Sequence, residues 1–315
     1  MKEADIIDAL KLSVEQNQTE VLLPIGDDGS VIKLGSKKQI VTVTDAITVD
    51  VHYPSGIESH AIGYRCLAVN LSDMAAMGAI PKWASLVFSV PKIDSNWIKG
   101  FIKGFSEIAN QYKISLIGGD TIRGPEFFAV SLQGYSKNEK YVRRTGAKVG
   151  DLIYVSGYLG SAAYGLELIK NSNRCESNNF IDAFLYPKPR VKEGIILAKY
   201  ASSMIDISDG FYQDLQRITK RQDIGFDIDV SLLPIEPNLE KVLGYEKAIN
   251  LAMNGGDDYE LCFTVPKEKE KQFLKEIRSS NLIHFSCIGE IIEKDNNIRD
   301  NGSKFIFEKN LFEQF

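Results

Sequence analysis

The chain has 315 residues, of which 44% are hydrophobic and 25% charged, a composition typical of globular proteins that bury a full core. Its 37 basic and 42 acidic residues give a formal net charge of −5, which argues against a broad nucleic-acid-binding surface. No apolar run approaches the roughly 18 residues of a membrane span, and the N-terminal MKEADIIDAL lacks the apolar core of a signal peptide. The four cysteines form no CxxC pair, as expected of reduced thiols. We therefore expect a cytoplasmic protein without nucleic-acid or membrane partners.

The first half of the chain alternates β-like and helix-like segments. We expect Ser72-Asp73 to break the first of its helices and Ser95 to cap the second, and we expect one strand to end in a turn at Gly118-Gly119. The expected elements of this half are strands at 38–51, 84–91, 113–120 and 126–136 and helices at 56–79 and 95–112.

A polar, basic segment, KNEKYVRRTGAKVGD at 137–151, marks the expected boundary between two domains, 1–137 and 138–315. After it, a new strand and helix begin, so that each half mixes strands with helices and the chain is predicted to be α/β or α+β. The expected elements of the second half are strands at 151–157, 226–235, 260–266 and 285–292 and helices at 160–171, 191–201, 211–220 and 266–280.

Six apolar runs end in acids, with glycine, serine or threonine beside nearly every one. Each case alone is explained as well by a turn or a helix cap. Together they indicate a site, because α/β folds build sites where strands and helices end. If these carboxylates converge, their mutual repulsion requires cations. The acids are Asp27, Asp28, Asp45, Asp73, Asp120, Asp206, Asp209, Asp257, Asp258 and Glu260.

The chemistry of these side chains favours a hard cation. Carboxylate and hydroxyl oxygens suit Mg²⁺, and the three histidines show no zinc spacing. Mg²⁺ held by carboxylates usually has phosphate co-ligands, and the glycines at 118–119, 255–256 and 156–165 can bring backbone N–H groups to anionic oxygens. The sequence contains no P-loop, GxGxxG or GxSxG motif. The residues themselves therefore predict a Mg²⁺-dependent enzyme that handles phosphate groups.

At these residues the sequence resembles the thiamine-monophosphate kinase family. The resemblance runs from residue 24 to the C-terminus in the family's order, and several of the matching stretches are long. These are PIGDDGS, VTDAITVDVH, AVNLSDMAAMGA, LIGGDTIRGP, RTGAKVGD, IDISDGF, GGDDYELCFTVP and LFEQF.

The resemblance implies a fold of the aminoimidazole-ribonucleotide-synthetase-like superfamily. In this fold an N-terminal ATP- and Mg²⁺-binding domain dimerises through its sheet, and a C-terminal α/β domain completes the active site between the two. It also implies an activity: direct in-line transfer of the γ-phosphoryl group of ATP to thiamine monophosphate, which yields thiamine diphosphate and ADP in the last step of thiamine diphosphate biosynthesis. The expected partners are therefore ATP, thiamine monophosphate and a second copy of the chain.

The resemblance also assigns roles to individual residues. Arg144 would steady the transferring group and contact ATP together with Gly119, Asp120 and Ser208. His52, Asp257 and Phe312 would contact thiamine monophosphate. The implied metal ligands are Asp28, Thr44, Asp45, Asp73, Asp120, Asp206 and Asp209.

Some positions depart from the family pattern, and rival functions stay open. Asp257 stands where the family usually has Glu, Val43 where Ser is common, and Phe312 where Trp or Tyr is usual. The rivals are another ATP-using enzyme of the superfamily, such as a purine-pathway or selenophosphate synthetase, and an inactive metal-binding module. Asp214, five residues beyond Asp209, is predicted to be a surface acid of a helix.

Overall fold

The computed structural model describes residues 39–137, 140–171, 178–280 and 282–307, together with Ala9, Leu12, Ser13, Val21–Leu23, Val31–Ile32 and Gly35. The candidate residues Asp28 and Phe312 lie outside this described part of the chain. The chain divides into two compact units, Met1–Met74 with Ala79–Glu139 and Ala75–Gly78 with Lys140–Phe315. Within the described ranges, none of the helices combines the length and hydrophobicity that crossing a membrane requires.

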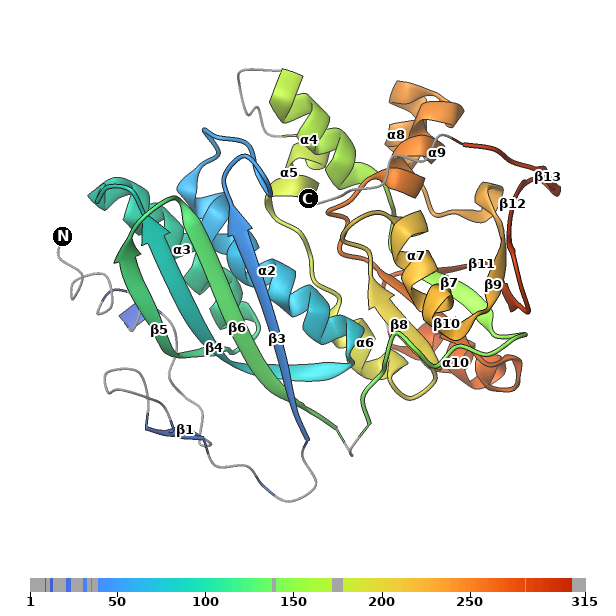
Figure 1. The fold of residues 1–315 in the computed structure, drawn as a ribbon, viewed down its shortest axis with the longest axis horizontal. Coiled ribbons are helices and arrows are strands. Elements are labelled where there is room, and N and C mark those ends of the chain that lie inside the picture. The colour runs from blue at the N-terminus through green and yellow to red at the C-terminus, as the bar shows by residue number, and fades with distance from the viewer. Residues whose placement is uncertain are drawn as a thin grey trace. The chain divides into compact units, whose positions relative to one another are not determined.

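The first unit contains a four-stranded sheet with two helices on one of its faces (Figure 1). The strand order is β3-β6-β4-β5, antiparallel except for the parallel β4–β5 pair. The strands are β3 (Gln39–Thr48), β4 (Ala79–Val90), β5 (Ser115–Arg123) and β6 (Phe127–Ser136), and β1 (Val21–Leu23) and β2 (Val31–Ile32) pair separately. The helices are α2 (Ser59–Ala76) and α3 (Ser95–Gln111).

The packing of α3 follows from its sequence pattern. Its apolar residues recur at helical spacing, and Phe101 is fully buried, where its ring packs against those of Phe88 and Phe128 of the sheet. The predicted cap was wrong by one residue: Asp94, not Ser95, is the N-cap, and its carboxylate accepts the N–H groups of Asn96 and Trp97.

Two expected interruptions in the first unit do not occur. Ser72 and Asp73 lie inside the continuous helix α2, where Ser72 is fully buried, so tertiary packing outweighs the weak helix preference of these residues. Strand β5 runs through Gly118-Gly119 and Asp120 to Arg123 because its pairing with β4 continues to the end. The acids Asp45, Asp73 and Asp120 therefore lie within elements and not at their ends.

The second unit is built on a seven-stranded sheet with the order β13-β12-β9-β11-β7-β10-β8 (Figure 1). Its pairs are antiparallel except for β9 with β12. The strands are β7 (Leu152–Ser156), β8 (Ser203–Asp206), β9 (Gly225–Asp229), β10 (Leu261–Val265), β11 (Phe285–Ile292), β12 (Asn296–Asp300) and β13 (Ser303–Lys304). The expected strand at 226–235 ends early, because a 3₁₀ turn, η2 (Val230–Leu232), follows β9.

Helices pack on both faces of this sheet. On one face, Phe211 and Leu215 of α7 join a buried cluster that includes Ile205 and Cys262 of the strands. On the other, the ring of Phe273 of α10 packs edge-on against aromatic rings of β7 and β10. The helices are α4 (Ser161–Asn171), α5 (Asn179–Leu185), α6 (Val191–Leu197), α7 (Phe211–Thr219), α8 (Pro237–Leu243), α9 (Tyr245–Asn254) and α10 (Lys267–Ser279), with η1 (Lys220–Gln222).

A short piece of the first half of the chain, Ala75–Gly78, belongs to the second unit. The carbonyl of Met77 accepts the N–H of Val142 at 3.1 Å. Gly78 has φ 65°, and a Cβ there would meet the Cβ of Ala198 at 2.6 Å. A Cβ on Gly194 of α6 would lie 2.1 Å from the carbonyl oxygen of Ala75. This close approach requires glycine at both positions.

Candidate active site

One group of candidate residues lies at the edge strand β3 of the first unit. The N–H of Asp45 donates to Asn70 Oδ1 of α2 at 3.0 Å, and the Asn70 amide donates to the carbonyl of Cys66 at 3.1 Å. Asn70 is fully buried, so this bond fixes the edge strand to the helix. Asp73 follows Asn70 by three residues, on the same side of α2. Asp45 and Asp73 are thus candidates for the same site, while sequence reasoning missed Asn70, the polar residue within LAVNLSD.

Thr44 and Asp45 point to opposite faces of the sheet because successive side chains of a strand alternate. Asp45 shares its orientation with the buried Ile47, on the face that the helices cover. Thr44 lies on the uncovered face, where its hydroxyl donates to Ser131 Oγ at 3.3 Å.

Gly119 and Asp120 lie on β5, at the opposite edge of the same sheet. In the register of the sheet, Asp45 of β3 and Gly119 of β5 lie in one row across the strands, with one residue of β6 and one of β4 between them. Neighbouring strands are about 4.8 Å apart, so three such spacings separate the two edge strands by roughly 14 Å. Two aspartates that share one Mg²⁺, with oxygens about 2.1 Å from the ion, have Cα atoms within about 12 Å of each other. Asp120 pairs with Val87 and so points to the uncovered face. Within one chain, the sheet therefore keeps Asp120 apart from Asp45.

Gly119 has a backbone conformation that only glycine adopts easily. Its φ is 151°, and a Cβ there would lie 2.0 Å from the carbonyl oxygen of Leu86. This glycine allows β5 to approach β4 closely just before Asp120, whose carboxylate accepts the N–H of Thr121 at 2.9 Å.

His52 lies in the turn after β3. Its ring Nδ1 accepts the backbone N–H of Thr48 at 3.2 Å, and the backbone N–H of His52 donates to the Thr48 carbonyl at 3.0 Å. A neutral ring with this bond carries its proton on Nε2. The imidazole is half-buried and fixed by the turn, as a substrate-contacting side chain should be.

In the second unit, Asp206 and Asp209 lie on either side of the connection between β8 and α7. Asp206 is the buried last residue of β8, and Asp209 stands one residue before Gly210, the N-cap of α7. The carboxylate of Asp214 accepts the backbone N–H groups of Ser208 at 3.0 Å and Asp209 at 3.1 Å. The prediction that Asp214 is a surface acid was wrong: it is fully buried.

Arg217 links two of these carboxylates. One of its nitrogens donates to Asp214 Oδ1 at 2.5 Å, and another forms an ion pair with Asp209 Oδ2. Burial and the nearby charge of Asp206 raise the pKa of the Asp214 carboxyl to about 7, although Arg217 opposes this shift. Arg217 was not among the residues predicted from the sequence.

The GGDDYE segment is bonded to the same connection. The N–H groups of Asp257 and Tyr259 donate to the carbonyls of Ser208 and Ile207, each at 2.9 Å, and the Ile207 N–H donates to the Glu260 carbonyl at 2.8 Å. Asp257 and Tyr259 have φ of 68° and 50°, which are uncommon for residues other than glycine. These bonds fix Ser208 beside Asp257, so the predicted ATP contact and substrate contact of this unit are held together.

The remaining acids of that segment bind protein groups. The carboxylate of Asp258 accepts the N–H groups of Gly160 at 2.8 Å and Ala162 at 3.3 Å at the start of α4, and burial raises its pKa to about 8. The buried Glu260 accepts a hydrogen bond from Ser156 at 2.6 Å and pairs with Arg190. These two acids are structural, and they hold the segment that carries Asp257.

Arg144 lies in the segment that precedes β7 and is exposed. The carbonyl of the preceding residue, Arg143, accepts the N–H of Met204 of β8 at 3.1 Å. The backbone next to Arg144 is therefore tied to the strand that ends in Asp206, while its side chain reaches solvent.

Across the described residues, no set of three or more His, Cys, Asp or Glu side chains is arranged to hold a metal ion. The structure bonds Asp45 to Asn70, which lies three residues before Asp73 on α2, and it brings Asp206 and Asp209 near Asp214, but it separates Asp120 from Asp45.

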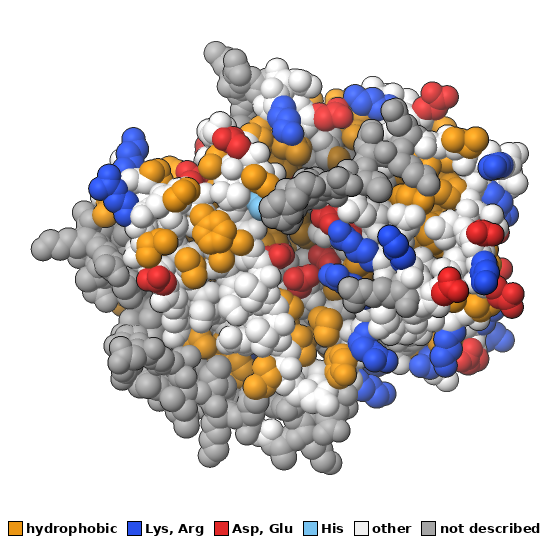
Figure 2. Space-filling model, in the orientation of Figure 1, with side chains coloured by type: hydrophobic (Ala, Val, Ile, Leu, Met, Phe, Trp, Pro, Cys, Tyr) orange, Lys and Arg blue, Asp and Glu red, His pale blue; other side chains and the backbone are white. Residues whose placement is uncertain are grey.

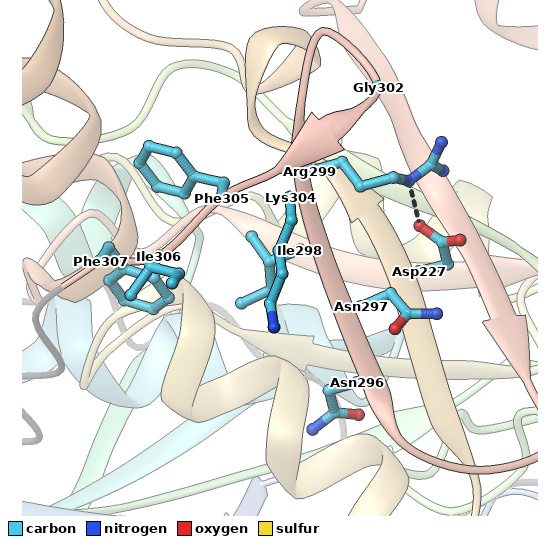
Figure 3. Close-up of a pocket in the computed structure, with 10 residues that line it drawn as sticks. All are labelled: Asp227, Asn296, Asn297, Ile298, Arg299, Gly302, Lys304, Phe305, Ile306 and Phe307. Carbon is cyan, nitrogen blue, oxygen red and sulfur yellow. Dashed lines mark hydrogen bonds and ion pairs between the residues drawn. The ribbon is translucent and has the colours of Figure 1, made fainter.

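A pocket of about 560 Å³ lies at the β12–β13 end of the second unit and contains none of the candidate residues (Figure 3). Its polar side holds the pair in which Arg299 donates to Asp227 at 2.7 Å, and Phe305 and Phe307 lie on another side. The lining residues are Asp227, Asn296, Asn297, Ile298, Arg299, Gly302, Lys304, Phe305, Ile306 and Phe307.

Both units match known family models. Residues 26–135 match the AIR synthase related protein, N-terminal domain, and residues 148–300 match the AIR synthase related protein, C-terminal domain. The matched ranges together span most of the chain.

Curated relatives and solved structures agree. The thiamine-monophosphate kinase of Buchnera aphidicola subsp. Schizaphis graminum is 39% identical, with 99% of this chain and 98% of the relative covered. That of Escherichia coli K12 is 37% identical over 88% and 86%. The crystal structure of thiamine-monophosphate kinase from Stenotrophomonas maltophilia K279a has a TM-score of 0.85 at 35% identity, covering 96% of both chains. AaThiL complexed with AMPPCP and TMP has a TM-score of 0.77 at 28% identity, covering 99% and 97%.

Proposed function

Because this chain belongs to the thiamine-monophosphate kinase family, we propose that it phosphorylates thiamine monophosphate with ATP, releasing thiamine diphosphate and ADP. The observation that carries the proposal is 39% identity to a thiamine-monophosphate kinase over 99% of the chain. The complex of AaThiL with AMPPCP, an ATP analogue, and TMP supports the same pair of substrates. We expect such an ATP-consuming enzyme to act in the cytoplasm.

The reaction is a direct transfer between two phosphate groups. An oxygen of the thiamine monophosphate phosphate attacks the γ-phosphorus, a new P–O bond forms, and the bond to the β,γ-bridging oxygen breaks so that ADP leaves with that electron pair. The attacking oxygen is already anionic near neutral pH and needs no general base. The main difficulty is the repulsion between two polyanions, so positioning and charge neutralisation supply the catalysis.

The donor atoms at the candidate site fit Mg²⁺. Thr44, Asp45 and Asp73 offer only hydroxyl and carboxylate oxygens in the first unit, and Asp206 and Asp209 offer carboxylates in the second. Bound Mg²⁺ would neutralise phosphate charge. Asp28 belongs to the same proposed set but lies outside the described residues.

The other assignments give each side chain a separate task. We assign Gly119, Asp120 and Ser208 to ATP and the exposed guanidinium of Arg144 to the transferring group. His52, whose ring is fixed by Thr48, and Asp257, fixed by Ser208, are assigned to thiamine monophosphate. Phe312 completes this substrate set from outside the described residues.

The proposal includes a homodimer formed through the uncovered face of the first unit's sheet. Hydrophobic side chains are exposed on that face, among them Ile40 at 59%, Ile122 at 48% and Phe127 at 37% exposure. Figure 2 shows hydrophobic side chains with few charged ones across this part of the surface. Exposed apolar patches of this kind mark interaction sites. Asp120 points to the same face as Thr44, so a second copy docked there could bring its Asp120 to the edge strand that carries Thr44 and Asp45.

A coupled assay of ADP release with thiamine monophosphate and Mg²⁺ tests the activity, with identification of thiamine diphosphate as the product. ADP formation without thiamine diphosphate would reject the assigned acceptor, and the absence of turnover would reject the kinase function.

Substitution of a proposed ligand tests the site. We predict that Asp45→Asn or Asp209→Asn loses most of the turnover, about 100-fold or more, because each removes a carboxylate charge that balances the bound cations. The fold should persist, as circular dichroism would show. Asp223→Asn is the matched control, since Asp223 is exposed with φ 53°, a conformation that asparagine tolerates. Near-normal turnover in either ligand variant would exclude the metal role of that residue.

A further inference from the structure

Arg217 lies between a candidate metal ligand and a buried anchor. Its guanidinium donates to Asp214 Oδ1 at 2.5 Å through one terminal nitrogen and pairs with Asp209 Oδ2 through the other. The planar fork of arginine allows both contacts at once. One guanidinium charge therefore holds both Asp209 and Asp214, each through a different terminal nitrogen.

Asp214 fixes the position of Asp209 in two ways. Directly, its Oδ2 accepts the backbone N–H groups of Ser208 and Asp209. Indirectly, its Oδ1 holds Arg217, which in turn holds the Asp209 side chain. Asp214 is fully buried, so both the backbone and the side chain of Asp209 are held by one buried carboxyl.

The exposures of the three side chains differ in a way that permits exchange. The side chain of Asp214 is 0% exposed, that of Asp209 is 25% exposed and that of Arg217 is 37% exposed. An ion can therefore reach Asp209 from solvent. The guanidinium of Arg217 can rotate so that the nitrogen on Asp209 turns to water while the other terminal nitrogen stays bonded to Asp214.

The charges around Asp209 require a cation beside it. Asp206, Asp209 and Arg217 are all electrostatic neighbours of Asp214. Three carboxylates that share a small volume repel one another, and a cation beside Asp209 lowers that repulsion. Arginine and a divalent cation would serve the same purpose at the same carboxylate.

We propose that Arg217 is a positioning residue that acts as a built-in counter-cation for Asp209 when no metal is bound, and that a bound divalent cation takes its place at the Asp209 carboxylate. The proposal rests on the assignment of Asp209 as a metal ligand in the proposed function. It predicts that Arg217 and Mg²⁺ stabilise the same carboxylate, so that losing one increases the effect of the other.

Thermal unfolding of the full chain, in EDTA and in saturating Mg²⁺, tests this without any measurement of activity. Arg217→Gln should lower Tm in EDTA by about 3 °C or more, and its gain in Tm on adding Mg²⁺ should exceed that of the wild type by a similar amount. Arg217→Lys keeps a charge and should show a smaller excess gain. An Arg217→Gln gain equal to the wild-type gain would overturn the proposal.

The matched control is Arg299→Gln. Arg299 forms an ion pair with Asp227 at 2.7 Å, with side-chain exposures of 43% and 24% that resemble those of Arg217 and Asp209. It lies among no candidate ligands, so it should lose some stability with no excess gain from Mg²⁺. An equal excess gain in Arg299→Gln would show a general charge effect and would also overturn the proposal.

A double variant separates this inference from the metal assignment on which it rests. The excess gain of Arg217→Gln should disappear in Arg217→Gln/Asp209→Asn, because the shared carboxylate is gone. If the wild type gains Tm from Mg²⁺ but the excess persists without Asp209, only the role of Arg217 fails. If the wild type gains nothing from Mg²⁺, the metal assignment fails and this inference fails with it.

Discussion

At the scale of single residues, the second unit depends on a buried acid. Asp214 occupies a position that the spacing of α7 makes buried, since Phe211, Asp214, Leu215 and Ile218 are related as i, i+3, i+4 and i+7. The buried carboxyl is useful because it satisfies two loop N–H groups that no strand or helix pairs. The single acid on the apolar face of α7 therefore positions the loop that carries Ser208 and Asp209.

Removing that acid should be costly. We predict that Asp214→Ala lowers the free energy of unfolding by about 2 to 4 kcal/mol, because two backbone N–H groups and Arg217 lose their buried acceptor. Asp214→Asn keeps one acceptor oxygen and should cost less. Urea denaturation measures both, with Asp223→Asn as an exposed control expected to stay within about 0.5 kcal/mol of the wild type, because asparagine tolerates the φ of 53° at that position. A loss for Asp214→Ala as small as that of the control would contradict this account.

At the scale of elements, the two halves of the candidate site are built differently. In the second unit, short connections bonded to one another carry Ser208, Asp209 and Asp257. In the first, Asp45 and Asp120 project from within paired strands, and Asp73 from within a helix. Residues within regular elements have little freedom, so this half of the site is preorganised by its hydrogen-bond ladder.

Strand β5 provides a test of that preorganisation. Gly119→Ala should lower Tm by at least about 3 °C and reduce activity, because its Cβ would collide with the Leu86 carbonyl and shift Asp120. Gly118→Ala is the matched control in the same strand, since its Cβ would lie 3.5 Å from Ser85 Oγ, an ordinary contact. If both variants behave like the wild type in a thermal melt and the coupled assay, the close approach at Gly119 is unimportant.

How far the sequence predicts this structure depends on the range of the interactions involved. Amphipathic spacing predicts α3, and the acidic motifs predict which residues to examine. Local reasoning fails at Ser72 and Gly118-Gly119, where the tertiary packing of α2 and the pairing of β5 with β4 extend these elements through residues that favour turns. It also misses Asn70, Arg190 and Arg217, because their partners are set by the tertiary fold or by a helix face that was misjudged.

At the scale of the whole molecule, the register of the first unit's sheet bears on the oligomeric state of the protein. Asp45 and Asp120 stand at opposite edges and point to opposite faces, yet both are proposed to act on the same bound phosphates and metals. We propose that a second copy docked on the uncovered face brings its Asp120 to the edge strand β3 of its neighbour, where Thr44 lies on that face and Asp45 is the next residue.

Mixing inactive variants tests this arrangement. Asp45→Asn and Asp120→Asn chains, co-expressed with different tags, should give about a quarter of the wild-type activity, because half of the dimers are mixed and each has one intact site. Each variant alone should stay nearly inactive. Mixed dimers that pull down through both tags but show no activity would place both aspartates in one chain, and a light-scattering mass near 35.1 kDa would exclude the dimer itself.

The assignment of Ala75–Gly78 to the second unit bears on how genes of this family can be recombined. A chimaera joined near residue 140 would combine a second unit from one parent with a foreign four-residue piece from the other. Gly78 and Gly194 leave no space for a side chain at that junction, so a parent with alanine at either position would clash with the transplanted unit. Successful exchange of this half between relatives therefore requires two crossovers, one on each side of Ala75–Gly78, in addition to the obvious one.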